Sequence, residues 1–316
     1  MPIAPDATLA DVGEFGLIRE LVALFPQGEQ VLVGPGDDAA VLRVRNGHVV
    51  VSTDLVVEGR HFRRDWASAE DVGHRAAAQN LSDINAMGGR ATSLTIGLAA
   101  PGDLPAAWAL EFARGFADEC AAVGASVVGG DLTRADQVVI AVTVIGGCTQ
   151  SPVLRSGARA GDVVALHGRQ GWAAGGLAVL ARGFRSPRVL VEAYRRPEPP
   201  YDAGRTAAEA GATAMIDVSD GLLADAGHVA AASGVAIDVR TSAFEVPEPL
   251  QAVGAALGAD PMRFLLTGGD DHPLLATFED AASVPKGWTV VGEVTEGSGV
   301  TVDGAEYDGP AGWTHF

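Results

Sequence analysis

Carboxylates are the side chains whose spacing in this chain most clearly indicates chemistry. Aspartates follow apolar segments or glycine turns, or lie in an apolar helix, at six places: Asp37 and Asp38, Asp54, Asp83, Asp131, Asp217 and Asp220, and Asp270 and Asp271. Hard oxygen ligands suit Mg²⁺ far better than zinc or copper. Because Mg²⁺ usually binds through a few carboxylates and the phosphates of its substrate, so many aspartates predict several Mg²⁺ ions and a polyphosphate ligand.

The charge balance narrows the kind of phosphate chemistry. The net charge of the 316 residues is −18, which argues against nucleic acid or an anionic membrane surface as a partner. The single lysine, Lys286, lies outside any P-loop motif or protein-kinase strand, so both of these machineries are excluded. Metal ions must then neutralise the phosphates. Arg134 and Arg155 are candidates for an arginine clamp, although an isolated arginine is more often a surface residue.

The first predicted ligands follow a β-branched run at residues 49–51. Such a run favours a buried strand, and we expect it to stop on Ser52, Thr53 and Asp54. These side chains would then lie at the edge of the sheet, where α/β proteins bind their ligands. The alternative is that the three residues only cap a turn.

A second acidic group lies in the segment 34–39. Its sequence matches the dinucleotide pattern G-x-G-x-x-A, but residues 39–44 (AAVLRV) indicate a strand rather than a helix. No helix N-terminus would therefore be available to hold a pyrophosphate. We interpret Gly36-Asp37-Asp38 as a tight turn that presents carboxylates, with a purely structural turn as the alternative.

Asp83 lies in a segment with a clear helix signature. Ser68 and Asp71 form an N-cap pattern that predicts a helix to about Met87, where two glycines end it. Because Asp83 is surrounded by apolar residues, its carboxylate would be costly there unless it were paired or metal-bound. The alternative is an aspartate on the helix surface.

The rest of the chain alternates predicted strands and helices. Apolar runs indicate strands over residues 92–98, 125–128, 137–145, 163–168, 214–217, 235–239 and 272–278, with helices over 13–25, 104–123 and 222–232 and two more strands in the tail. A turn-rich stretch over 146–162 predicts a domain boundary near residue 150, which gives domains 1–150 and 151–316. The predicted fold class is α/β (α+β), with two mixed α/β domains that face a shared acidic cleft.

Cysteine usage and the N-terminus indicate the cellular setting. Cys120 and Cys148 show no metal-ligand spacing, and buried reduced thiols are the expected state. There is no basic N-terminal region followed by an apolar segment, and no apolar run approaches membrane-spanning length. We therefore expect a cytoplasmic protein with no membrane partner.

Taken together, the motifs resemble those of a known family. GDDAA at Gly36, STDLVVEGRHF at Ser52, NLSDINAMGG at Asn80, GGDLTR at Gly129, DVSDGL at Asp217 and GGDDHPLL at Gly268 are similar to motifs of the thiamine-monophosphate kinases and follow in the same order. That family belongs to the ATP-binding superfamily that also contains aminoimidazole ribonucleotide synthetase. The resemblance implies the aminoimidazole ribonucleotide synthetase-like fold with the active site between its two domains, and a homodimer formed through N-terminal domain strands.

The resemblance also implies a reaction and a set of site residues. The reaction is ATP-dependent phosphorylation of thiamine monophosphate to thiamine diphosphate, the last step of thiamine diphosphate biosynthesis. The implied Mg²⁺ ligands are Asp38, Ser52, Thr53, Asp54, Asp83, Asp131, Asp217 and Asp220. The residues implied to meet ATP are Gly130, Asp131, Arg155 and Ser219, and those implied to meet the thiamine phosphate are His61, Asp270 and Trp313.

Residue chemistry alone supports one part of this mechanism and leaves two residues open. A phosphate acceptor is already anionic at neutral pH, so no general base is needed, and we predict direct in-line transfer governed by positioning and metal ions. Without the resemblance, His61 could be a surface histidine at a strand end. Trp313 could equally be a packing anchor near the C-terminus rather than a stacking partner for the substrate ring.

This chain departs from the family pattern at residues 268–274. The family usually has Gly-Gly-Glu-Asp-Tyr-Glu-Leu, where this chain has Gly-Gly-Asp-Asp-His-Pro-Leu. Asp270 keeps the charge of the glutamate but is one methylene shorter, and Pro273 removes a backbone donor and suits the start or edge of a strand. The departure puts substrate affinity or selectivity in question, and not the metal site.

Two other functions compete with this prediction. One is another enzyme of the same superfamily with a different acceptor. Hydrogenase-maturation relatives end in cysteine, whereas this chain ends in Phe316, and selenophosphate synthetases carry a reactive N-terminal cysteine, whereas the first cysteine here is Cys120. The other alternative is a non-catalytic nucleotide or metal sensor. Such a module would bind ATP without turnover, and the intact ligands at each metal motif argue against it.

Overall fold

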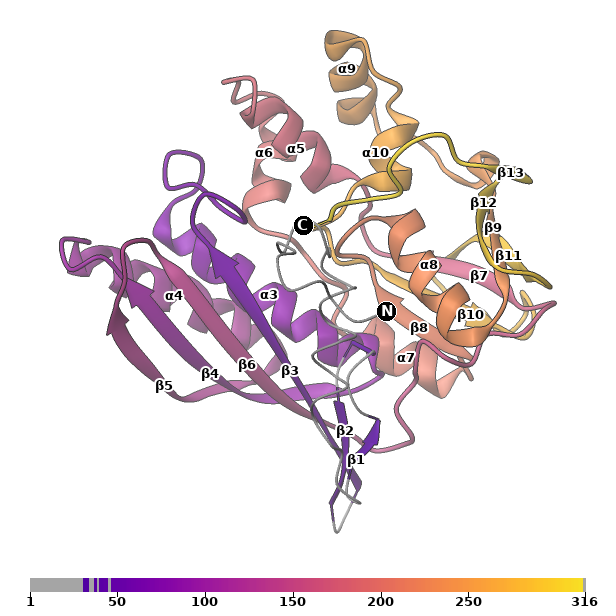
Figure 1. Ribbon diagram of the computed structural model, residues 1–316, viewed down its shortest axis with the longest axis horizontal. Helices are drawn as coiled ribbons and strands as arrows, with labels where there is room; N and C mark the ends of the chain where they lie inside the picture. The colour runs from indigo at the N-terminus through magenta and orange to yellow at the C-terminus, as the bar shows by residue number, and fades with distance from the viewer. Residues whose placement is uncertain (1–30, 34–36, 39, 45–46, 315–316) are drawn as a thin grey trace, which may run out of the picture.

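The computed structural model describes residues 31–33, 37–38, 40–44 and 47–314. The helix expected over residues 13–25 lies outside this range. The described chain forms two β-sheets flanked by helices, one sheet in each half of the sequence (Figure 1). Both halves mix strands and helices, as predicted.

The N-terminal sheet has six described strands in the order β1-β2-β3-β6-β4-β5. Their bounds are β1 Val31–Val33, β2 Ala40–Val44, β3 Gly47–Val57, β4 Arg90–Ala100, β5 Ser126–Arg134 and β6 Val139–Cys148. The β4–β5 pair is parallel and the other pairs are antiparallel. The β-branched runs of β3 and β6 lie at the centre of the sheet, and Val50, Ile140 and Val142 in them are fully buried, as β-branched strand residues favour.

Two predicted strand ends are strand interiors, and these predictions were wrong. β3 continues through Ser52, Thr53 and Asp54 because these residues pair with residues 142–144 of β6. β5 likewise continues through residues 129–131, which pair with residues 95–97 of β4. In each case the neighbouring strand supplies partners for the backbone groups, so the ladder continues past the point where the local composition changes.

Helices α3 (Ala69–Ala86) and α4 (Ala106–Val123) pack together and cover one face of this sheet (Figure 1). The predicted cap of α3 is confirmed. The backbone N–H of Asp71 donates to the Ser68 hydroxyl over 3.2 Å, and the Ser68 N–H donates to the Asp71 carboxylate over 3.0 Å. The two helices approach closely at Gly73 and Gly115, where an added Cβ would collide with the opposing backbone.

The C-terminal sheet has seven described strands in the order β13-β12-β9-β11-β7-β10-β8. Their bounds are β7 Val163–His167, β8 Ala214–Asp217, β9 Ala236–Val239, β10 Leu274–Phe278, β11 Thr289–Thr295, β12 Gly299–Val302 and β13 Ala305–Glu306, so the tail adds three strands where two were expected. The helices are α5 Trp172–Leu180, α6 Arg188–Arg195, α7 Ala203–Glu209, α8 Leu222–Ser233, η1 Thr241–Ala243, α9 Glu248–Leu257 and α10 Met262–Thr267.

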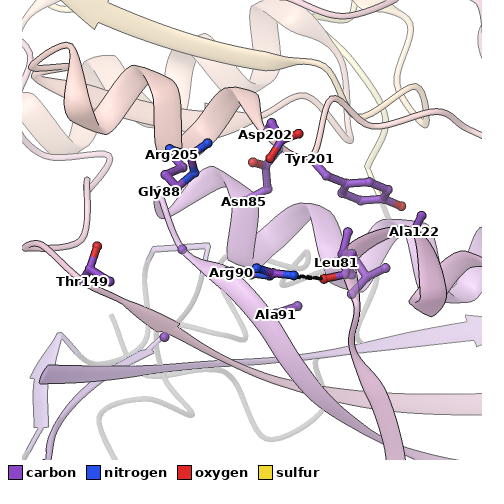
Figure 2. A pocket seen from close by; sticks show the side chains of 13 residues that line it. Leu81, Asn85, Gly88, Arg90, Ala91, Ala122, Thr149, Tyr201, Asp202 and Arg205 are labelled. Atoms are coloured by element: carbon purple, nitrogen blue, oxygen red, sulfur yellow. Dashed lines mark hydrogen bonds between the residues drawn. The ribbon is translucent and has the colours of Figure 1, made fainter. Parts of the chain in front are cut away.

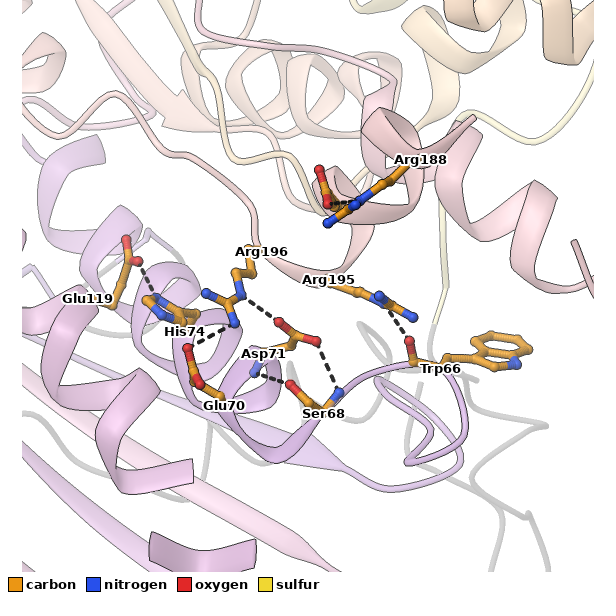
Figure 3. Close-up of polar contacts among 10 residues, drawn as sticks. Trp66, Ser68, Glu70, Asp71, His74, Glu119, Arg188, Arg195 and Arg196 are labelled. Carbon is orange, nitrogen blue, oxygen red and sulfur yellow. Dashed lines mark hydrogen bonds and ion pairs between the residues drawn. The ribbon is translucent and has the colours of Figure 1, made fainter. Parts of the chain in front are cut away.

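Helix α3 also ties the two halves together. It contacts β8, α6 and α7 as well as its own sheet. Figure 3 shows its N-terminal turn, where Arg196 donates to Asp71 over 2.5 Å and to Glu70 over 3.0 Å, and where Arg195 donates to the carbonyl oxygen of Trp66. The proline-rich segment after α6 is therefore anchored to the N-terminal half.

Two smaller expectations also bear on the described chain. Cys120 and Cys148 are both free and buried, as predicted. Within the described part of the chain, no helix combines the length and the apolar character that a membrane span requires.

Candidate metal and phosphate site

Four of the predicted carboxylates converge where the two halves meet. Asp83 of α3 interacts electrostatically with Asp54 of β3, with Asp217 at the end of β8 and with Asp38, which lies just before β2. Asp38 also interacts with Asp217. Since α3 packs against both β3 and β8, this helix brings carboxylates from the two halves together.

Burial and mutual repulsion raise the pKa values of Asp38 and Asp83. Burial is the largest cause that holds the pKa of Asp83 well above its ordinary value, with Asp54 and Asp217 adding to it and a hydrogen bond from Ser52 opposing it. Burial likewise raises the pKa of Asp38 to about 8, against the attraction of Arg155. A cation among these groups would remove the repulsion that disfavours their ionised forms.

The donor set fits Mg²⁺. Among the described residues of the acidic group, the Oδ2 atom of Asp38 is buried and has no hydrogen-bond partner. Buried polar atoms without a partner are uncommon and point to a missing ion or water. Carboxylate and hydroxyl oxygens are the ligands that Mg²⁺ prefers.

The predicted ligands on β3 point to opposite faces of the sheet. Side chains alternate along a strand, so Ser52 and Asp54 share one face and Thr53 lies on the other. The face of Asp54 is the one covered by α3, since Gln79 of that helix donates to its Oδ2 atom over 3.1 Å. Thr53 is exposed, and its hydroxyl lies 2.8 Å from that of Thr143 on β6. Thr53 therefore does not join the acidic group.

Asp131 also lies apart from the acidic group. Asp54 pairs with Val142 of β6, and Val142 pairs on its other side with Ile96 of β4. Ile96 pairs in turn with Gly130 of β5, the residue before Asp131. Three strand spacings separate the first and last of these positions, which is about 14 Å. Asp131 is exposed on this edge strand. At Gly130 a Cβ would collide with the carbonyl oxygen of Ile96, so a structural reason for that glycine exists beside the predicted contact with ATP.

Arg155, one of the two candidate clamp residues, is close to the acidic group. Its guanidinium pairs with Asp38, and its backbone N–H donates to Asp37 over 2.9 Å. Burial lowers the pKa of Arg155, but Asp38 and Asp37 outweigh this and raise it. Arg134, the other candidate, ends β5 at the edge of the sheet.

Helix α8, which follows the turn after β8, carries a carboxylate that the sequence analysis missed. Asp225 in the first turn of α8 accepts hydrogen bonds from the backbone N–H groups of Asp220 and Gly221, each over 3.0 Å. Ligand atoms of Asp220, Asp225 and His228 lie within 4.8 Å of one another. Burial, followed by the charge of Asp220, holds the pKa of Asp225 well above its usual value. An aspartate at the start of a helix after an Asp-Gly turn was the available signal.

Two of the three predicted substrate residues flank the same turn. The Asp270 N–H donates to the Ser219 carbonyl over 2.9 Å, and the Trp313 N–H donates to the Asp220 carbonyl over 2.9 Å. The Trp313 side chain is 53% exposed, so its ring is accessible to a ligand. His61 lies on the turn after β3, where its Nδ1 atom accepts from the Val57 N–H over 3.0 Å.

Residues 270–272, where the chain departs from the family pattern, are each anchored to a different element. Asp270 pairs with Arg75 of α3, and Asp271 accepts from the N–H of Ala173 at the start of α5. His272 lies 2.9 Å from Asp217. Asp270 and His272 have positive φ angles of 68° and 54°, a backbone conformation that costs energy for residues other than glycine. These three contacts hold the segment in that conformation.

A separate cavity of about 640 Å³ opens between the C-terminal end of α3, the start of β4 and the start of α7 (Figure 2). Its lining includes Asn85, Arg90, Tyr201 and Arg205, and none of the predicted site residues. The acidic group is thus distinct from this cavity.

The two α/β halves each match a family model, and together they place the chain among the AIR synthase related proteins. The family model for the N-terminal domain of AIR synthase related proteins matches residues 36–148, and the model for the C-terminal domain matches residues 159–304. A thiamine-monophosphate kinase of Mycobacterium tuberculosis is 47% identical over 98% of this chain and 93% of its own length. The corresponding protein of Aquifex aeolicus is 33% identical over 98% of this chain and 99% of its own length.

A solved structure extends the similarity to three dimensions. AaThiL complexed with AMPPCP and TMP superimposes with a TM-score of 0.91 at 32% identity, covering 99% of this chain and 100% of that one. The chain belongs to the thiamine-monophosphate kinase family and is a kinase. The resemblance and the fold predicted from the motifs are both confirmed.

Proposed function

We propose that this protein transfers the γ-phosphoryl group of ATP to thiamine monophosphate and forms thiamine diphosphate and ADP. The observation that carries the proposal is the convergence of Asp38, Asp54, Asp83 and Asp217 from both halves of the chain. The similarity of this chain to AaThiL, which was solved in complex with AMPPCP and TMP, supports the choice of nucleotide and acceptor.

The residues around the acidic group have distinct roles in this proposal. Mg²⁺ would be held by Asp38, Ser52, Asp54, Asp83, Asp217 and Asp220, and when bound it would neutralise the charge on the phosphates. The acceptor phosphate is already ionised, so no side chain removes a proton and transfer is direct and in line. Catalysis then depends on how the chain positions the two substrates.

The remaining predicted contacts fall into two groups. Arg155 and Ser219 would meet ATP, and the guanidinium of Arg155 would exchange part of its pairing with Asp38 for a phosphate. His61, Asp270 and Trp313 would meet the thiamine phosphate, with the exposed ring of Trp313 stacking on the substrate ring.

The proposal includes a homodimer in which a second copy covers the outer face of the N-terminal sheet. Leu55 and Ile145 lie on this face, opposite the face covered by α3, and are 54% and 36% exposed. Thr53 and Asp131 lie on the same face. A second copy would bury these apolar side chains and would bring Thr53 and Asp131, predicted ligands that lie apart from the acidic group in one chain, against a neighbouring surface. The cytoplasmic location remains a prediction.

The test is formation of ADP and thiamine diphosphate from MgATP and thiamine monophosphate, with free thiamine as the control acceptor. Asp54→Asn should abolish Mg²⁺-dependent product. Asp162→Asn is the control, because Asp162 is a buried aspartate outside the acidic group that is held by Thr213 and the N–H of Arg159. Binding of MgATP without any product from the native protein would contradict the proposal.

A further inference from the structure

Arg75 of α3 is a buried arginine that reaches the predicted substrate residues from the other half of the molecule. Its side chain is 5% exposed, and one terminal nitrogen lies 2.5 Å from the Oδ2 atom of Asp270. The other terminal nitrogen donates to the carbonyl oxygen of Tyr194 over 2.5 Å. The guanidinium carbon lies 4.8 Å from the centre of the Tyr194 ring. Tyr194 thus fixes the guanidinium of Arg75, and one terminal nitrogen of this group is directed to Asp270.

Asp270 differs from the usual partner in a buried ion pair. The Asp270 side chain is 45% exposed, whereas the Arg75 side chain is almost fully buried. Its backbone is fixed independently, because its N–H donates to Ser219 and its φ angle is 68°. A carboxylate has two oxygens, so one can accept from Arg75 while the other accepts from a ligand. The exposed carboxylate and Trp313 flank the same turn.

We propose that Arg75 is a positioning residue for substrate recognition, which holds the carboxylate of Asp270 toward a cationic or N–H-donating ring. The proposal rests on the proposed function, because the thiamine ring system is such a group. A planar guanidinium fixes the orientation of a carboxylate more closely than an ammonium group does. This fixing matters more for Asp270 than for the longer glutamate usual in the family, since a shorter side chain has less freedom to find the ligand by itself.

Steady-state kinetics of Arg75→Met test the proposal. The KM for thiamine monophosphate should rise by about tenfold to a hundredfold, the loss expected for one hydrogen bond to a charged group. The value of kcat and the KM for ATP should stay within about twofold of the native values, because Arg75 acts only through Asp270. Arg75→Lys keeps the charge but lacks the planar guanidinium, so its KM for thiamine monophosphate should lie between those of the native protein and Arg75→Met.

A double mutant separates positioning from a structural role. If Arg75 acts through Asp270, the KM for thiamine monophosphate of Arg75→Met/Asp270→Asn should equal that of Asp270→Asn alone. The control is Arg196→Met, which also removes a contact between α3 and the other half but leaves Asp270 untouched. It should lower the Tm without changing the KM for thiamine monophosphate.

Three results would overturn the inference: an equal rise in the KM for ATP, additive effects in the double mutant, or an unchanged KM for thiamine monophosphate. If Arg75→Met does not fold, Arg75→Lys alone and with Asp270→Asn gives the same comparison. A native protein that forms no thiamine diphosphate in the same assay would contradict the proposed function, and the inference would fail with it. An active native protein with an unmoved KM in the variants would contradict the inference alone.

Discussion

The Nδ1 atom of His272 lies 2.9 Å from the Oδ2 atom of Asp217, and the two side chains are 6% and 4% exposed. Asp217 is one of the carboxylates that converge at the predicted metal site, and it interacts with Asp38 and Asp83. A hydrogen bond to one oxygen of a ligating carboxylate fixes the direction of the other. His272 therefore orients Asp217, although it stands where the family usually has tyrosine.

Replacing His272 by phenylalanine should weaken metal binding. We expect the affinity for Mg²⁺ or Mn²⁺ to fall by about tenfold to a hundredfold, as is usual when a residue behind a metal ligand is lost. His272→Tyr should recover part of the loss by restoring a donor. Mn²⁺ titration followed by electron paramagnetic resonance measures this directly, with His48→Phe at the far end of β3 as the control. Equal affinities in the native protein and His272→Phe would show that Asp217 needs no such support.

Asp83→Asn should separate metal binding from stability. In the metal-free protein the partly buried Asp83 carboxyl group lies near Asp54 and Asp217, so replacing it by a neutral amide should raise the free energy of unfolding by on the order of 1 kcal/mol near pH 8. The increase in Tm that Mg²⁺ produces should shrink, and kcat should fall by at least about a hundredfold.

Thermal unfolding with and without Mg²⁺ checks both effects of Asp83→Asn. Asp162→Asn should do the opposite, because Asp162 accepts hydrogen bonds from Arg159 and Thr213 and has no part in the acidic group. It should lower the Tm and leave the Mg²⁺ response intact. A metal-free Asp83→Asn protein less stable than the native one would contradict the repulsion inferred for this group.

Local signals predicted the elements that carry the site, but they did not predict the ends of those elements. The cap of α3 and the turn after β8 depend on neighbouring residues, so the sequence sufficed for them. The ends of β3 and β5 depend on β6 and β4, which lie far along the chain. Once β3 is known to continue, the alternation of side chains along a strand places Thr53 on one face of the sheet and Ser52 and Asp54 on the other.

Contacts between distant residues could not be found from local pattern. His272 and Asp217 are 55 residues apart, and Arg75 and Asp270 come from different halves of the chain. Both pairs form only because α3 and the segment after α10 pack near the end of β8. The cluster of aspartates was predictable because each follows its own local signature, whereas the residues that orient them have no such signature.

Asp71 should make stability depend on pH in the acid range. Burial raises its pKa, but hydrogen bonds from Arg196 and Ser68 outweigh burial and lower the pKa below 3.8 (Figure 3). A carboxyl group with a lowered pKa contributes stability above its unfolded pKa, and this contribution disappears as the pH falls through the folded pKa. Asp71→Asn should therefore cost about 1 kcal/mol at pH 7, a modest value because solvent screens its partner Arg196, whose side chain is 42% exposed.

Urea unfolding at pH 7, 5 and 3 checks the Asp71 prediction. The difference between native and variant proteins should be constant from pH 7 to 5 and should narrow toward pH 3. Glu192→Gln is the control, since Glu192 pairs with Arg188 on an exposed helix face and should show no measurable difference at any pH. A difference for Asp71→Asn that stays the same at pH 3 would show that the loss comes from packing and not from the charge.

The proposed dimer predicts that a charge on the outer face of the N-terminal sheet gives a monomer. Leu55 is 54% exposed on the face opposite α3, so Leu55→Arg should prevent a second copy from covering it and should halve the mass measured by light scattering. Leu110→Arg is the matched control, because Leu110 is 60% exposed but lies on α4. A native protein with the mass of one chain would contradict the dimer, and a Leu55→Arg protein with the mass of two chains would move the interface to another surface.

If Thr53 and Asp131 act only within the dimer, Leu55→Arg should also lose activity in proportion to the fraction of monomer.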